Sequence, residues 1–418
     1  MLGVGAAGPT GRSAGPAGAS RADASRRISV GERDAWAVLT SVSGLGPVGF
    51  GALLRHYGRG TAILEAALRP RAVVELIAAG INDERATFGA DVARAIVEAA
   101  REPQLVLDRI EAAGVSVVTL DDDEYPNRLR SIEMPPHVLF VTGDVAGLNS
   151  NHAVAVVGTR RATEGGRMIS ARIGAAIAKT GAVVISGLAV GIDGAAHAAV
   201  NAEGGRTVAV LGSGHGRLYP QAHVGLARSI IEHGGALISE LPPDMAPTAG
   251  TFPRRNRLIS GLADATIVVE AGERSGALIT AAWALEQGRE CFLVPGSIDA
   301  PRSAGCLQWL RNYTDQVRIV AGISELIEDL GLLAEEPAAR RAGRLSIEAE
   351  LIELGATARS LAIELVRGRG TLDELVAATG QPVATALGAL TLLELRGLAT
   401  SAYGRYRPAG RLAGMTPL

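Results

Sequence analysis

Between residues 104 and 332 the sequence alternates short apolar runs with longer amphipathic stretches. The apolar runs, rich in Val, Ile and Leu, occupy residues 115–120, 137–143, 153–158, 182–187, 207–212, 236–241, 265–270 and 290–296. Continuous apolar runs of this length suit strands that are covered on both faces, and helices between consecutive strands indicate parallel crossovers. We therefore predict an α/β fold, an extended Rossmann-like doubly wound sheet, over residues 104–332.

Two smaller regions flank the predicted sheet. Residues 29–103 have a helical pattern and contain a helix-hairpin-helix (SAM-like) signature at 41–58, in which a Gly-Leu-Gly-Pro turn joins two helices. That turn either presents backbone amides to a phosphate or is an ordinary connection in a small helical domain. Residues 346–410 have the layout of a winged helix, with Thr371 as a helix cap and a short ribbon after the helices. Such a domain binds either DNA or protein, and both alternatives stay open.

The remaining segments are polar and poor in large apolar side chains. We predict a disordered leader over residues 1–28, a linker over 333–345 and a short tail over 411–418. The leader lacks the apolar core of a signal peptide, and no run of about 18 apolar residues predicts a membrane span. We expect a cytoplasmic protein that does not contact membranes.

Composition argues against several chemistries. Lys179 is the only lysine, and it does not stand in a Walker-type loop, so neither a P-loop nor Schiff-base catalysis is expected. Two cysteines form no metal or disulfide pattern, and we predict no cofactor and no metal. Because the formal net charge is only −2, any nucleic-acid site must be a local patch of positive charge.

The segments after the predicted strands are the places where an open α/β sheet binds ligands. Most of them combine glycines with the start of a helix, which favours a phosphate-bearing ligand. Glu240 and Glu270 could serve as an acid/base pair, and Asp193 with His197 could hold a metal. The simpler interpretations, in which Asp193 caps a helix and the carboxylates are structural, are stronger.

One arginine-rich motif, Thr-Phe-Pro-Arg-Arg-Asn-Arg at 251–257, precedes the strand at 265–270. With Arg160 and Arg161 after an earlier strand, it predicts a cluster of arginines at the edge of the sheet. Arginines bind phosphates through a planar fork, and Phe252 could stack on a base. The alternative is that some of these arginines pair with Glu240, Glu270, Asp264 or Glu273 and hold loops together.

The ordered set of motifs at 157–163, 186–197, 207–220, 238–243, 252–263 and 268–296 resembles the DNA-processing protein A (DprA/Smf) family. The resemblance is dense from about 105 to 330. It implies a DNA-binding recombination mediator without a chemical step, which protects single-stranded DNA and helps to load the RecA recombinase during DNA-mediated transformation (competence) and DNA recombination. It also implies a homodimer formed through the Rossmann-like domain.

By the same resemblance, the DNA-binding site is predicted from the turn at 158–160 and from the arginine motif, and residues 161, 275 and 276 at the ends of strands are added to it. The predicted residues are Gly158, Thr159, Arg160, Arg161, Phe252, Arg254, Arg255, Asn256, Arg257, Ser275 and Gly276. The alternative function is that of a nucleoside-monophosphate phosphoribohydrolase-like (lysine-decarboxylase-like) enzyme, although its catalytic loop is not matched at 270–281. A weaker third hypothesis is a winged-helix regulator with a nucleotide-sensing domain.

Overall fold

The structure is a computed structural model that describes residues 30–82, 85–332, 347, 350–402 and 404–414. The predicted leader (1–28) and linker (333–345) lie outside these residues. The predicted tail lies partly outside them, since only 411–414 are described, in a short 3-10 helix, η4 (Gly410–Gly414).

A nine-stranded sheet forms the centre of the molecule, as the alternating pattern predicts. Its strand order is β11-β10-β9-β5-β6-β7-β8-β4-β3. The pairs β3–β4 and β4–β8 are antiparallel, and all the other pairs are parallel. The strands are β3 (Ser116–Thr119), β4 (Val138–Gly143), β5 (Ala153–Val157), β6 (Val183–Ser186), β7 (Thr207–Val210), β8 (Ala236–Ser239), β9 (Ala265–Val268), β10 (Glu290–Leu293) and β11 (Arg318–Ile319).

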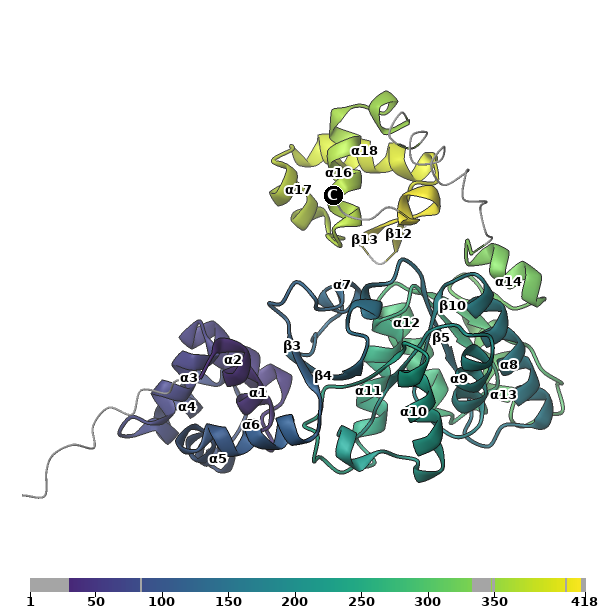
Figure 1. Ribbon diagram of the computed structural model, residues 1–418. Helices are drawn as coiled ribbons and strands as arrows, with labels where there is room; N and C mark the ends of the chain where they lie inside the picture. Colours follow the sequence, from purple (N-terminus) through teal and green to yellow (C-terminus); the bar gives the residue numbers. More distant parts are fainter. Residues whose placement is uncertain (1–29, 83–84, 333–346, 348–349, 403, 415–418) are drawn as a thin grey trace, which may run out of the picture.

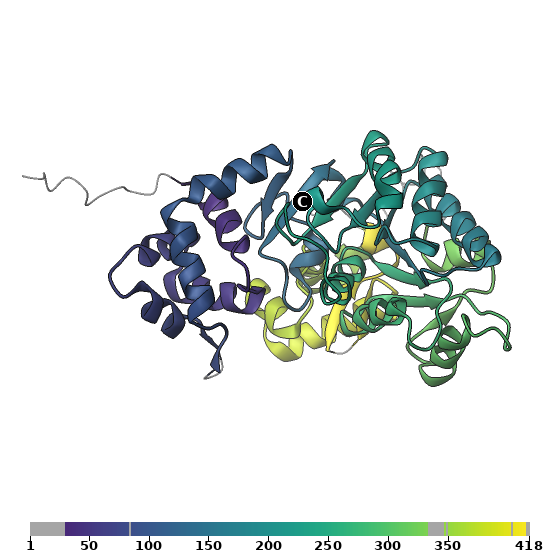
Figure 2. The same ribbon diagram turned by 90° about the horizontal axis from the view of Figure 1, so that it is seen from below.

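Helices cover both faces of this sheet (Figures 1 and 2). The helices of this region are α7 (Asn127–Arg130), α8 (Glu164–Lys179), α9 (Ile192–Ala202), α10 (Val224–Glu232), α11 (Thr251–Gly261), α12 (Gly276–Glu286), α13 (Ala304–Asn312) and α14 (Ile323–Asp329). Successive strand residues face opposite cores: Val208 and Val210 pack with α11 and α12, whereas Ala209 packs with α10. This double burial explains why the strands are continuous apolar runs.

The chain order reverses at β5. Strands β6, β7 and β8 extend the sheet on one side of β5, and β9, β10 and β11 extend it on the other. The crevice between the carboxyl ends of β5 and β9 is therefore the topological switch point, where open α/β sheets bind their ligands.

The N-terminal helical region shares its core with the sheet. It consists of α1 (Glu32–Thr40), α2 (Pro47–Tyr57), α3 (Gly60–Ala67), α4 (Ala72–Ala79), β1 (Ile81–Asn82), β2 (Arg85–Ala86), α5 (Ala90–Arg101) and α6 (Pro103–Ala112). Its apolar cluster includes Val138 and Phe140 of β4. His137 lies against Trp36 and Phe50, with ring centroids 5.9 and 4.8 Å away. The predicted domain limit at 103/104 stays a prediction, because the core crosses it.

The predicted helix-hairpin-helix is present as α1, a turn and α2. Within the turn, the amide of Leu45 donates to the carbonyl of Val42 and that of Gly46 to the carbonyl of Gly44. These two amides are therefore already paired, which favours the interpretation of an ordinary connection.

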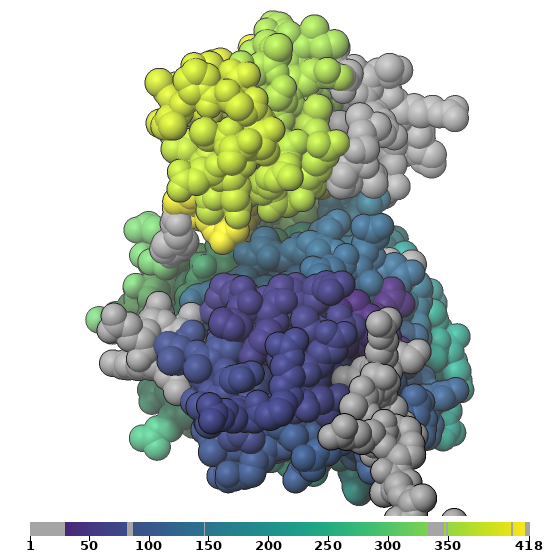
Figure 3. Space-filling view, turned by 90° about the vertical axis from the view of Figure 1, so that its left-hand side faces the viewer, coloured from purple at the N-terminus to yellow at the C-terminus, as the bar shows by residue number. Residues whose placement is uncertain are grey.

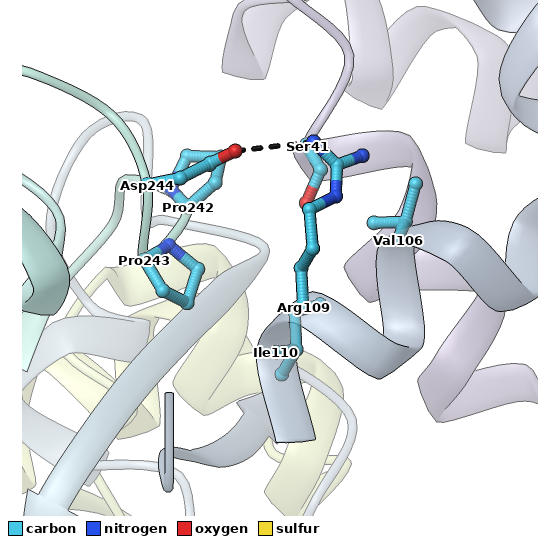
Figure 4. Close-up of a pocket in the computed structure, with 7 residues that line it drawn as sticks. All are labelled: Ser41, Val106, Arg109, Ile110, Pro242, Pro243 and Asp244. Carbon is cyan, nitrogen blue, oxygen red and sulfur yellow. Dashed lines mark hydrogen bonds and ion pairs between the residues drawn. The ribbon is translucent and has the colours of Figure 1, made fainter. Parts of the chain in front are cut away.

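The helical region also contacts the loop between β8 and α11. Figure 4 shows Arg109 of α6 reaching Asp244, with 3.1 Å between Nη1 and Oδ2. Val106 and Ile110 face Pro242 and Pro243 across a pocket of about 40 Å³. The same loop holds the segment after β7, since the carbonyl of Pro243 accepts the amide of Gly216.

The C-terminal domain is a winged helix, as predicted, and stands above the helical region in Figure 3. It comprises α16 (Ala356–Val366), α17 (Leu372–Thr379), α18 (Val383–Leu395), β12 (Ala399–Ala402) and β13 (Arg405–Pro408). Thr371 forms the predicted cap, with a reciprocal bond from Glu374. Within the described residues no single helix is long and apolar enough to cross a membrane; only α17 and α18 together pass by length and composition, across a 111° bend.

Most arginines of this domain are engaged within the protein. Arg367 and Arg369 pair with Glu364, while Arg407 of β13 lies against Gly288 of the sheet domain. The second helix of the helix-turn-helix, α18, contains no lysine or arginine and exposes Val383, Leu387, Leu392 and Leu395 among others. A helix that recognises DNA in a groove needs hydrogen-bond donors and positive charge. The surface of α18 therefore does not favour the hypothesis that this domain binds DNA.

Candidate nucleic-acid interface at the carboxyl edge of the sheet

The arginine motif forms the first turns of α11, a helix that the sequence analysis did not predict. Pro253 occupies the first turn, where its missing amide costs no intrahelical bond. Phe252 is half-buried and Arg254 is exposed, whereas Arg255, Asn256 and Arg257 are buried. The motif therefore divides into an outer and an inner part.

Arg255 belongs to the inner part and ties strand ends together. Its Nη1 donates to the carbonyl of Gly187 at 2.8 Å and to the carbonyl of Val210. Only 5 % of the residue is exposed, and burial lowers the pKa of its guanidinium to about 10, while nearby Asp193 opposes the shift. A Cβ on Gly187 would lie 2.6 Å from Arg255, so only glycine lets the guanidinium approach this closely.

Arg257 is also structural in its contacts. Its guanidinium forms an ion pair with Glu240, and burial lowers its pKa. The exposed Arg254 reaches the other oxygen of Glu240 at 3.4 Å. The charge of Glu240, whose side chain is 8 % exposed, is thus neutralised by two arginines. The alternative in which arginines hold loops together therefore applies to Arg254 and Arg257.

Asn256 links α11 to the start of α12. Its Nδ2 donates to the carbonyl of Gly276 at 3.0 Å. Ser275 caps α12 by accepting the amide of Ala277, and Gly276 is exposed with open space around it. The predicted residues Ser275 and Gly276 therefore form an open helix N-terminus that Asn256 holds in place.

Arg160 and Arg161 are exposed directly after β5, at the switch point. Thr159 shapes this turn: its amide donates to the carbonyl of Glu270 at 2.7 Å, and its hydroxyl accepts the amide of Arg161. Among the residues that the structure describes, no carboxylate forms an ion pair with Arg160 or Arg161. Their charges are available to a ligand.

An aromatic pair stands beside these arginines. The guanidinium carbon of Arg160 lies 4.8 Å from the ring centroid of Phe252, and the ring of Tyr219 lies 5.5 Å from the same ring. Phe252 in turn packs over Gly212, where a Cβ would come within 2.6 Å of its ring. Tyr219 is 47 % exposed, which is unusual for an aromatic residue in a chain with so few of them.

Tyr219 was missed by the sequence analysis, as was Arg217. Both follow β7 in a loop without helical or strand periodicity, and Arg217 is exposed. The proximity of Tyr219 to Phe252 depends on the packing of α11 against the end of β7. Two signals could have found Tyr219: it lies in the motif at 207–220, and it is a tyrosine followed by proline after a strand.

At two of the glycine-rich strand ends, carboxylates of the protein accept the amides that a phosphate was expected to bind. Asp193, predicted as a helix cap, is the second residue of α9 and accepts the amide of Gly187 at 3.1 Å. Glu270 accepts the amide of Thr163 at 3.0 Å, at the start of α8. Internal carboxylates thus occupy two of the places where a phosphate was expected.

Neither catalytic alternative gains support from the geometry. Glu240 is paired with arginines and Glu270 is 5 % exposed. His197 donates to or accepts from the hydroxyl of Thr207 at 2.7 Å, and burial lowers its pKa to about 3. Within the described ranges, no group of three or more potential ligands could hold a metal ion.

The fold and this edge define a class: an α/β protein with a winged helix attached, whose switch point carries exposed arginines that no described carboxylate pairs with, beside aromatic side chains. The family described as DNA recombination-mediator protein A matches residues 116–331, and the DprA winged helix domain matches 370–405. The chain belongs to this DprA/Smf family.

Relatives agree over most of the length. A DNA processing protein DprA of Mycobacterium tuberculosis is 39% identical over 330 residues, which are 75% of this chain and 81% of that protein. The DNA processing protein DprA of Bacillus subtilis is 38% identical over 232 residues, 56% of this chain and 78% of that one. The structure of DNA processing protein A from Streptococcus pneumoniae has a TM-score of 0.58 at 29% identity, covering 72% of this chain and 98% of that chain.

Proposed function

We propose that this protein binds single-stranded DNA at the carboxyl edge of its sheet and acts as a recombination mediator without a chemical step. The observation that carries the proposal is the position of Arg160, exposed and unpaired by any described carboxylate, directly over the ring of Phe252. Membership of a family of DNA recombination mediators supports it.

Each part of the predicted site has its own role in this proposal. Arg160, Arg161 and Arg254 contact phosphates, and Phe252 and Tyr219 offer faces to bases, which are accessible only in a single strand. The open start of α12, with Ser275 and Gly276, adds backbone amides for a further phosphate. The predicted residues Gly158 and Thr159 shape the turn that carries the first two arginines.

The buried residues of the site act through others. Arg255 and Arg257 hold α11 against the ends of β6, β7 and β8, and Asn256 holds it against the start of α12, so that Phe252 stays below Arg160. They are positioning residues in this proposal, and DNA does not touch their guanidinium or amide groups.

The test is an anisotropy titration of fluorescent single-stranded and duplex oligonucleotides at two salt concentrations. Arg160→Ala/Arg161→Ala should weaken single-strand binding strongly and lower the salt slope by about one unit for each lost phosphate contact. Phe252→Leu and Tyr219→Ala should each cost about 1–3 kcal/mol of binding with little change in the salt slope.

The matched control is Arg167→Ala. Arg167 is an exposed arginine of α8 that pairs with Glu164, so its loss should leave binding unchanged. Equal affinity of wild type and Arg160→Ala/Arg161→Ala for single strands, with both folded, would contradict the proposal.

Two finer roles rest on the family resemblance alone: a homodimer formed through the sheet domain, and help in loading the RecA recombinase. Light scattering of the purified protein tests the dimer, where a mass of one chain at micromolar concentration counts against it. A strand-exchange assay on single strands coated with a single-strand-binding protein tests RecA loading. The expected result is faster exchange with wild type than with Arg160→Ala/Arg161→Ala.

A further inference from the structure

A second surface lies in the N-terminal helical region, at the end of the molecule away from the sheet (Figures 1 and 3). Here the connection between α3 and α4 meets α5 around a pocket of about 270 Å³. The pocket is separate from the carboxyl edge of the sheet, and nothing in the proposed function uses it.

The pocket floor is apolar. Six of its nine lining residues are aliphatic, and they are Ala67, Leu68, Ala72, Val73, Val74 and Val97. Two of them are strongly exposed for their size: Leu68 at 43 % and Val74 at 68 %. Exposed aliphatic side chains that line a hollow are typical of interaction surfaces.

The other three lining residues are all arginines: Arg69, Arg71 and Arg101. All three are exposed, and none of them forms an ion pair with any carboxylate among the described residues. No acidic residue lines the pocket. These three arginines form the rim of the pocket, and the lining thus carries three positive charges and no negative one, in a chain whose formal net charge is −2.

The aliphatic floor and the arginines at the rim together indicate which kind of partner fits the pocket. A nucleic acid would satisfy the arginines, but it would leave the aliphatic floor facing sugars and phosphates, and the lining has no aromatic ring on which a base could stack. A peptide with an apolar side chain between carboxylates satisfies both, since its anchor dehydrates the floor and its acids pair with the rim.

We propose that the pocket between α3, α4 and α5 binds an acidic peptide segment of a partner protein, with an apolar anchor seated on Leu68 and Val74. Such a segment would bring a partner protein to the N-terminal helical region, away from the sheet. This inference goes beyond the proposed function and does not depend on it.

The test uses the full chain and a fluorescein-labelled peptide in which aspartates flank a Leu-Leu-Phe anchor. Wild type should bind this peptide with an affinity that falls as salt rises. Two control peptides, one with serines for the anchor and one with asparagines for the aspartates, should each bind at least about tenfold more weakly.

Variants of exposed residues locate the site without threatening the fold. Val74→Asp should abolish binding of the peptide, because it places a like charge on the floor. Arg101→Ser should weaken binding roughly two- to fivefold, as expected for one exposed ion pair. Arg94→Ser is the matched control, an exposed arginine of the same helix that pairs with Asp91, and it should bind as wild type does.

Three results would overturn the proposal. The first is equal binding of the anchored and serine peptides, which would mean simple charge attraction. The second is unchanged binding by Val74→Asp. The third is loss of single-stranded DNA binding, rather than peptide binding, in Arg101→Ser, which would make the surface part of a nucleic-acid site.

Discussion

The sharpest consequence of the structure concerns Arg255, which a motif-based interpretation would place in contact with DNA. We expect Arg255→Ala to lower the free energy of unfolding by about 3–5 kcal/mol, as when one partner of a buried ionic group is removed. The loss arises because two buried carbonyls, on Gly187 and Val210, lose their donor at about 1–3 kcal/mol each, and Asp193 loses a nearby positive charge.

Two companion variants make this expectation specific. Arg254→Ala, on the same helix but with a side chain 45% exposed, should change stability by no more than about 1 kcal/mol. Arg255→Lys keeps the charge but cannot fork to both carbonyls, so its stability should lie between those of wild type and Arg255→Ala.

The assay is urea unfolding followed by tryptophan fluorescence, in which Trp283 on α12 reports on the helix that packs against α11. Single-stranded DNA binding is then measured in conditions where each variant is folded. The reasoning is refuted if Arg255→Ala unfolds at the same urea concentration as wild type and yet fails to bind DNA. That result would make Arg255 a direct ligand.

Three further predictions follow from other features. Gly187→Ala should destabilise the fold by about 1–3 kcal/mol, because its Cβ meets Arg255; an unchanged melting temperature contradicts this. Burial lowers the pKa of His137 to about 4, so stability should fall by up to about 3 kcal/mol as the pH drops from about 6.5 to about 4. The proton binds more tightly to the unfolded chain, and His137→Phe should therefore flatten this acid slope in denaturation curves; an unchanged slope refutes it. A chain ending at residue 331 should keep its affinity for single strands within about twofold, since α18 exposes no positive charge, and a tenfold loss in anisotropy titration would disprove this.

The sheet could be predicted because burial on both faces leaves a signal in each strand by itself. The runs at 153–158 and 207–212 contain little besides Val, Ala and Leu, and each coincides with a strand within two residues. The two-residue strand β11 has no such run, and its residues Arg318 and Ile319 are exposed, so it left no signal.

The motif at 251–257 shows where prediction from sequence ends. Its residues could be singled out by type, yet their division into exposed and buried members depends on carbonyls that lie 68 and 45 residues away along the chain. The sequence cannot distinguish a buried arginine that donates to main-chain carbonyl oxygens from an exposed arginine that can bind a phosphate. Only the packing of α11 on the strand ends separates the two.

The core that the helical region shares with β4 bears on how this chain folds. A polypeptide beginning near residue 104 would expose Phe140 and Val138 on one face, next to β3, the outermost strand. An uncovered apolar face at the edge of a sheet favours association with other copies of the chain and aggregation. The helices α1–α5 thus cover this face with residues of the same chain, and helices and sheet should melt as one cooperative unit.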